Sequence, residues 1–252
     1  MIVNADDAGL APEVDAGILE TIRAGAVTSV SMFVNPPHAC DLAPFRAAGV
    51  SIGLHVNLTQ GLPCAPARRV ASIVDAQGRF FADGRERLKE FRLTDIAAEV
   101  EAQLARFQEV AGAAPTHIDF HKHLHAHDAR VLQLALDVAR ALDVPLRAVD
   151  EAMRARAREV GVLAADHWVG GVRPAPYWTR ERLCAALREL PAGITELMCH
   201  PARGMRPVAG LWYCAERDTE REALTCEEAA RRFAGVTLVS FANAPFAREG
   251  TA

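Results

Sequence analysis

The sequence lacks the features that mark several classes of protein. Its six cysteines form no CxxC pair and match no zinc-finger spacing. No apolar run reaches the roughly 18–20 residues that a membrane-spanning helix needs. The chain opens with MIVNADD, without the charged and apolar regions of a secretory signal. We therefore expect a reduced, cytoplasmic protein without a membrane span.

The sequence also does not indicate nucleic acid or nucleotides as partners. The formal net charge is −4, and the short basic clusters at 68–70 and 230–233 are isolated, as is typical of solvated faces. Neither GxGxxG nor GxxxxGK[ST] occurs, so dinucleotide and P-loop sites are not indicated. Hydrophobic residues make up 50% and charged residues 24% of the 252 positions, which is ordinary for a soluble globular protein.

Short strand-like runs alternate with helical patterns along the chain. This alternation predicts a parallel sheet, and the length favours a distorted or whole (β/α) TIM-like barrel in a single domain over 1–252. An open doubly wound sheet is the alternative. Residues 61–90, rich in Pro, Gly and Asp, indicate an irregular insertion near the site. The expected strands are 1–6, 27–35, 51–58, the histidine row described below, 145–149, 194–201 and 235–243, and the expected helices are 12–26, 93–112, 129–142 and 225–235.

Polar side chains follow several of the expected strands. Asp6 and Asp7 lie in the segment NADD at the end of the first expected strand. His55 and Asn57 lie in GLHVNL, and His200 lies in ELMCHP. Functional groups of α/β proteins gather at the carboxyl ends of strands, and charged or imidazole groups are costly there unless they bind something. Read singly, the acids could be helix caps and His55 a core histidine.

Five of the nine histidines lie in THIDFHKHLHAHD, residues 116–128. On a strand, Asp119, His121, His123 and His125 would share one face. Same-face neighbours are about 6.5 Å apart, whereas two ligand atoms of one ion can be at most about 4.2 Å apart. At most two of these histidines can therefore bind one metal, and the others would orient ligands or hold substrate. A solvated sheet face is the alternative.

The residue types suit metal-dependent hydrolysis. One Asp and two His with open coordination positions form a site for a divalent catalytic metal. Such an ion lowers the pKa of a bound water and polarises a carbonyl. A second carboxylate can take the proton of the water, and a histidine can protonate the leaving group.

Five segments carry a resemblance to a known family: IVNADDAGL, GAVTSVSMFVN, IGLHVNLTQGLP, PTHIDFHKHLH and ITELMCHPARG. In order and spacing they resemble the YdjC-like carbohydrate deacetylases, from residue 2 to about 204. That family includes diacetylchitooligosaccharide deacetylases and a branch associated with hopanoid biosynthesis, to which HKHLH is the closer match. The resemblance implies a distorted (β/α) barrel that removes an N-acetyl group from an amino sugar, an N-acetylglucosamine oligosaccharide or a glycolipid.

The resemblance also implies roles for single residues. Asp7, His55 and His121 would bind one divalent ion, magnesium or zinc, while Asp6 would be the base and His200 the acid or oxyanion partner. The expected substrate contacts or supporting residues are Asn57, Asp119, His123, His125 and Arg173, with Tyr177 or Trp178 stacking on a sugar ring and His117 and His127 structural. A surface arginine and core aromatics are the alternatives for Arg173, Tyr177 and Trp178. A homodimer is a further possibility.

Two alternatives remain open at this point. One is a metal-dependent hydrolase of another amide or of a phosphoester. The other is a carbohydrate-binding protein without turnover, against which the pair of Asp6 and His200 argues, because a binding protein needs no proton-transfer groups.

Overall fold

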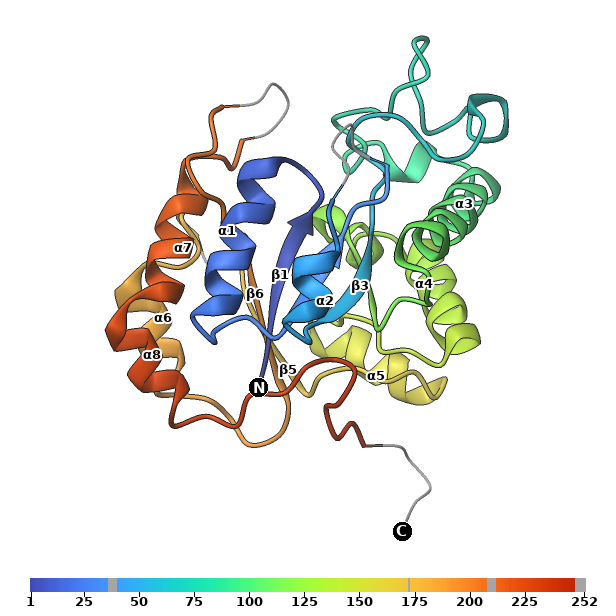
Figure 1. Ribbon diagram of the computed structural model, residues 1–252. Coiled ribbons are helices and arrows are strands. Elements are labelled where there is room, and N and C mark those ends of the chain that lie inside the picture. The colour runs from blue at the N-terminus through green and yellow to red at the C-terminus, as the bar shows by residue number, and fades with distance from the viewer. Residues whose placement is uncertain (36–39, 172, 208–211, 248–252) are drawn as a thin grey trace. The chain divides into compact units, whose positions relative to one another are not determined.

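The computed structural model describes residues 1–35, 40–171, 173–207 and 212–247, which form an α/β fold (Figure 1). Every strand pair with a defined register is parallel. The order of the six strands in the sheet is β4-β3-β2-β1-β6-β5. The strands are β1 (Ile2–Ala8), β2 (Ser29–Met32), β3 (Ser51–Val56), β4 (Ile118–Phe120), β5 (His167–Val169) and β6 (Thr195–Cys199).

Helices separate most of the strands, as the alternating pattern predicts. The distorted (β/α)-barrel class is confirmed, with fewer strands than the regular barrel has. Among the described helices, none combines the length and apolar composition needed to cross a membrane. The helices are α1 (Pro12–Arg23), α2 (Ala43–Ala47), α3 (Leu93–Ala111), α4 (Ala129–Leu142), α5 (Glu151–Glu159), α6 (Arg180–Ala186), α7 (Glu216–Thr225) and α8 (Glu227–Phe233), with 3-10 turns η1 (Ala67–Arg69), η2 (Leu88–Glu90) and η3 (His121–Ala126).

The chain divides into two compact units, and each is described by itself. The first comprises 1–32, 40–52 and 165–246, and the second 33–39, 53–164 and 247–252. Strand β3 begins in the first unit and continues in the second. The prediction that 1–252 form one domain stays a prediction.

The first unit is built on β1, which pairs with β2 on one side and β6 on the other. Its helices form a layer beside these strands, in which α7 contacts α1, α6 and α8 (Figure 1). Helix α1 begins at Pro12, as predicted, and buries Val14, Ile18 and Ile22. A Cβ on Gly17 would lie 2.4 Å from the Cα of Ala202, so the loop after β6 packs directly on α1 only because this position is glycine.

The strand predicted over 235–243 is wrong. This segment passes the amino ends of the strands and bonds to them singly: Val239 N donates to Met1 O, and Phe241 N to the hydroxyl of Ser29. Phe241 packs with Ile2 in an apolar cluster. The apolar pattern therefore reflects a segment that covers the base of the first unit, because such burial needs no continuous ladder of hydrogen bonds.

The second unit holds the short strand β4 and the long helix α3, which contacts α4 (Figure 1). Helix α3 ends at Gly112 in the left-handed region, with φ of 64°, as predicted. Its N-cap is Arg92. Asp95 accepts a hydrogen bond from Ser72 N and forms an ion pair with Arg92, and the first contact ties the irregular segment 61–90 to the helix.

The histidine row does not continue as a strand. Strand β4 ends at Phe120, and the chain then turns into η3, with Lys122 (φ 55°) and His123 (φ 53°) in the left-handed region. The prediction that the row shares one strand face is therefore wrong. The predicted strand 145–149 is reduced to one parallel bridge between Leu146 and Ile118.

Candidate active site

Two aspartates lie at the carboxyl end of β1 in the first unit. The register between β1 and β2 shifts between Ala5 and Ala8, and Asp7 has φ of 71°. Asp tolerates the left-handed region better than most residues, and such conformations persist where the surroundings fix them. Asp6 and Asp7 are each 1% exposed. The irregular strand end therefore holds two adjacent buried carboxylates.

Asp6 lies between an amide and an imidazole. Asn4 Nδ2 donates to Asp6 Oδ1 at 2.8 Å and to Ser31 Oγ at 2.8 Å. His200 Nε2 lies 3.8 Å from Asp6 Oδ2. The two predicted proton-transfer groups, Asp6 and His200, are thus neighbours within the first unit.

Asp7 pairs with an arginine that lies 210 positions away in the sequence. Arg217 Nη2 donates to Asp7 Oδ2 at 2.5 Å, and Arg217 Nε donates to the backbone oxygen of Tyr213 at 2.9 Å. Both charged side chains are almost fully buried. This pair fixes the orientation of the Asp7 carboxylate.

His200 is held from its backbone and its ring. Its backbone N–H donates to Glu220 Oε2 at 2.6 Å, and the hydroxyl of Tyr213 donates to Glu220 Oε1. The rings of Tyr177 and Tyr213 each meet the His200 ring edge to face, with centroids 5.6 Å apart. Burial raises the pKa of Glu220 to about 7, against the opposing hydrogen bonds from Tyr213 and His200.

The other predicted contacts of the first unit divide into exposed and buried groups. The Arg173 guanidinium lies 5.0 Å from the centroid of the Trp212 ring, and Trp212 is 54% exposed. Tyr177 stacks on Tyr213. Trp178 is buried and donates its ring N–H to Met198 O, so it is a core residue at the end of β6.

In the second unit, His55 and Asp119 face each other across the register of β3 and β4. His55 Nδ1 lies 2.7 Å from Asp119 Oδ1, and Arg147 Nη1 lies 2.6 Å from Asp119 Oδ2. Burial acts to raise the pKa of Asp119, but the charge of Arg147 and then the interaction with His55 outweigh it and hold this pKa far below its usual value. An ionised Asp119 keeps the proton of His55 on Nδ1 and leaves the lone pair on Nε2.

His121 meets His55 at that second nitrogen. His55 Nε2 and His121 Nδ1 are 3.3 Å apart, and both rings contact Phe33 edge to face at 4.9 and 5.0 Å. This separation is within the roughly 4.2 Å that two nitrogen ligands of one ion can span. The turn into η3 therefore brings His121 of the row to His55.

The later histidines of the row lie in other surroundings. His125 is buried, stacks on Phe120 and bonds through Nε2 to Arg147 O at 2.9 Å. Burial lowers the pKa of His125 to about 4, so it is neutral at pH 7. His123 lies in the left-handed turn of η3. These positions favour a supporting role for His125 over contact with substrate.

Asn57 organises the loop after β3. Its side-chain amide donates to Gln60 O at 2.8 Å, and its side-chain oxygen accepts from the backbone of Thr59 and Gln60. Its backbone is bonded on both sides by the Gln103 amide from α3. His117, predicted as structural, is fully buried at the start of β4, and its ring occupies the space that a Cβ on Gly53 would need.

The sequence reasoning missed three buried charged residues. Arg147 pairs with Asp119, Arg217 pairs with Asp7, and Glu220 supports His200. One signal was available, because Arg147 stands in the apolar run PLRAV, where an unpaired charge would be costly. Arg217 and Glu220 belong to a charge-rich helix sequence, from which a buried pair cannot be distinguished.

Each unit contains side chains that could hold a metal ion. These are Asp6 and Asp7 in the first unit and His55, Asp119 and His121 in the second. Carboxylate oxygen and imidazole nitrogen suit divalent ions such as zinc, and the orientation of His55 by Asp119 is the usual arrangement behind a metal-binding histidine. The donor set therefore fits a divalent cation.

The sequence matches known proteins along most of its length. Residues 1–234 match the family described as YdjC-like protein. A carbohydrate deacetylase of Geobacillus stearothermophilus is 37% identical over 95% of this chain and 96% of that protein. A chitooligosaccharide deacetylase of Serratia marcescens is 33% identical over 96% of this chain and 97% of that protein.

A solved structure has a similar fold. The crystal structure of a candidate cellobiose-phosphate cleavage protein from Enterococcus faecalis V583 matches with a TM-score of 0.83 and 27% identity, over 95% of this chain and 96% of that one.

Proposed function

This chain belongs to the YdjC-like family, and from that premise we propose that it is a metal-dependent carbohydrate N-deacetylase. It would hydrolyse the N-acetyl group of an amino sugar or its conjugate, such as an N-acetylglucosamine oligosaccharide or a glycolipid. The observation that carries this proposal is the similarity to carbohydrate and chitooligosaccharide deacetylases over almost the whole chain.

For the metal, we propose Asp7, His55 and His121 as the ligands of one divalent ion, magnesium or zinc. Two observations support this proposal. His55 Nε2 and His121 Nδ1 are 3.3 Å apart, and the hydrogen bond with Asp119 orients the His55 ring. When bound, such an ion would act as a Lewis acid and lower the pKa of a water bound to it.

The chain's own groups would move the protons. Asp6, fixed by Asn4, takes a proton from the water whose oxygen adds to the acetyl carbonyl carbon. The carbon–nitrogen bond then breaks, and the leaving amine nitrogen receives a proton from His200, so the products are acetate and the free amino sugar. The 3.8 Å between His200 Nε2 and Asp6 Oδ2 supports this pairing of base and acid.

For the sugar, we propose contacts from Arg173 and Tyr177 in the first unit. Arg173 supplies hydrogen-bond donors beside the exposed ring of Trp212. We assign Asn57, Asp119 and His125 to orienting neighbouring groups, on the contacts described above, and keep His123 as a substrate contact.

The test is acetate release from N-acetylglucosamine and its oligomers, with metal content measured on the same sample. We expect activity to vanish with a chelator and to return when one divalent ion is added back. Sugar binding without acetate release across a broad panel would instead support a binding protein.

A second candidate is cleavage of a phosphorylated disaccharide. The one observation that favours it is the description of the similar E. faecalis protein. Incubation with cellobiose phosphate, followed for glucose, glucose phosphate and inorganic phosphate, separates this activity and phosphoester hydrolysis from deacetylation. The cytoplasmic location and the homodimer remain predictions, for cell fractionation and light scattering to test.

A further inference from the structure

We propose that helix α7 positions two groups of the reaction, with Arg217 fixing Asp7 and Glu220 fixing His200. This inference deepens the proposed function and rests on it. Both residues act through another group, so they are positioning residues, and neither was singled out by the sequence motifs.

Helix α7 buries two charged side chains one turn apart. Arg217 and Glu220 are 2% and 0% exposed, and residues three apart lie on the same face of a helix. Burial of a charge is unfavourable unless the group is paired and hydrogen-bonded. Each of these two charges meets a residue that follows a strand: Asp7 at the end of β1 and His200 after β6.

Arg217 holds Asp7 in a fixed direction because its own guanidinium is anchored. One nitrogen donates to the Asp7 carboxylate at 2.5 Å, and Nε donates to Tyr213 O at 2.9 Å. Two anchors on a planar guanidinium leave it little freedom to rotate. The carboxylate it holds belongs to a residue in the left-handed region, at a strand end where the register is irregular.

Glu220 holds His200 through two routes. One carboxylate oxygen accepts the His200 backbone N–H, and the other accepts the hydroxyl of Tyr213, whose ring contacts the His200 imidazole. The hydroxyl of Tyr213 also accepts from Tyr177 N, and the two tyrosine rings stack. A single buried carboxylate thus supports both the backbone of His200 and the aromatic wall around its ring.

The same helix provides matched controls. Arg221 pairs with Glu20 of α1 and with Asp218, so it ties α7 to α1 through its own ion pairs. Glu222 is an exposed acid of the same helix, with a side chain 69% exposed. Loss of a structural tether can therefore be separated from loss of positioning.

The first test measures the affinity of the metal-free protein for Zn²⁺ by calorimetry. We expect Arg217→Lys to weaken it about 10- to 100-fold, as is usual for residues that orient ligands, and Arg221→Lys to leave it unchanged. An affinity of Arg217→Lys equal to that of the parent would overturn the role of Arg217. Arg217→Gln is the second variant; if both Arg217 variants are unfolded while Arg221→Lys folds, the role is structural and the proposal fails.

The second test compares Glu220→Gln with Glu222→Gln. We expect Glu220→Gln to lower kcat about tenfold with unchanged Zn²⁺ affinity and to move the imidazole resonances of His200 in NMR spectra, and Glu222→Gln to do neither. Unmoved His200 resonances, or an unfolded Glu220→Gln protein beside a folded control, would contradict positioning by Glu220. Zn²⁺ affinity and NMR need no turnover, so a parent protein without acetate release would refute the proposed function while leaving this inference testable.

Discussion

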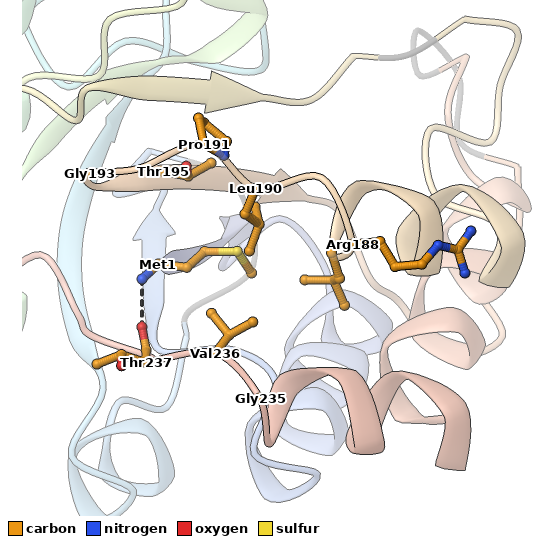
Figure 2. Close-up of a pocket in the computed structure, with 10 residues that line it drawn as sticks. Met1, Arg188, Leu190, Pro191, Gly193, Thr195, Gly235, Val236 and Thr237 are labelled. Carbon is orange, nitrogen blue, oxygen red and sulfur yellow. Dashed lines mark hydrogen bonds between the residues drawn. The ribbon is translucent and has the colours of Figure 1, made fainter.

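The two ends of strands β1 and β6 differ in the contacts that their side chains make. Their amino ends border a cavity of about 310 Å³, whose lining includes Leu190, Val236, Arg188 and Thr195 (Figure 2). The amino group of Met1 there donates to Thr237 O at 2.6 Å. Their carboxyl ends lead to Asp6, Asp7 and His200, all held by polar contacts.

The same contrast recurs within the second unit on the three-residue strand β4. His117 precedes the strand, is fully buried and fills the space opposite Gly53. His121 follows the strand and meets His55 nitrogen to nitrogen. Two histidines four positions apart therefore have different surroundings because they lie at opposite ends of one strand. Under the proposed function, the reacting groups therefore lie at the carboxyl ends of the strands, whereas the side chains at the amino ends stabilise the fold.

The largest effect should come from Asp6→Asn at the carboxyl end of β1. The amide keeps the shape but cannot take a proton, so we expect kcat to fall about 10²- to 10⁴-fold while Zn²⁺ affinity is retained. Acetate release and calorimetry measure the two quantities. Substantial remaining turnover would remove Asp6 as the base.

A smaller effect should come from Asp119→Asn, which keeps the volume but removes the charge that orients His55. We expect metal affinity to fall about 10- to 100-fold, because residues behind a metal-binding histidine fix its ring and proton. Equilibrium dialysis with Zn²⁺ measures this loss. Unchanged affinity would mean that Asp119 serves the fold alone.

A modest effect on substrate binding should come from Trp212→Ala. Removing this exposed ring beside Arg173 should raise KM for an N-acetylglucosamine oligomer about fivefold with kcat preserved, and Trp212→Phe should restore most of the affinity. Steady-state kinetics on both variants give the comparison. An unaltered KM in Trp212→Ala would exclude the ring as a sugar contact.

The smallest effect on activity should come from Leu187→Ala at the amino end. Leu187 is 7% exposed and lines the cavity at the amino ends of β1 and β6. We expect a loss of about 2 kcal/mol in the free energy of unfolding and an unchanged kcat at 25 °C. Urea unfolding and acetate release check the two halves of this statement. A large loss of kcat in the folded variant would contradict the assignment of activity to the carboxyl ends and of stability to the amino ends.

The sequence predicted the parallel α/β fold because apolar runs and helical periodicity are local signals. The boundaries of α4 show this most directly, since the predicted range 129–142 is the observed one, with Asp128 as its N-cap. The strand predicted over 235–243 failed because an apolar segment can be buried beneath a sheet without pairing with it. The local pattern of apolar residues predicts which segments are buried, but it does not predict which backbone groups they bond to.

The candidate site was predictable where a residue type alone carries the chemistry. Asp7, His55 and His121 could be proposed from the family resemblance, whereas Arg217, which bonds to Asp7, could not, because it is 210 positions away in the sequence. The histidine row misled for another reason. Consecutive left-handed residues at Lys122 and His123 interrupt the strand. Positive φ values are uncommon for residues other than glycine, so this turn could not be predicted from the residue types.

Metal stoichiometry in histidine variants tests the central claim most directly. Parent protein, His55→Ala, His121→Ala and the control His127→Ala, which changes a histidine of the same row, would be dialysed against Zn²⁺ and analysed for bound metal. The account predicts one ion per chain in the parent and in His127→Ala, and none in the other two variants. One tightly held ion in folded His55→Ala or His121→Ala would contradict the assignment of ligands to the strand ends.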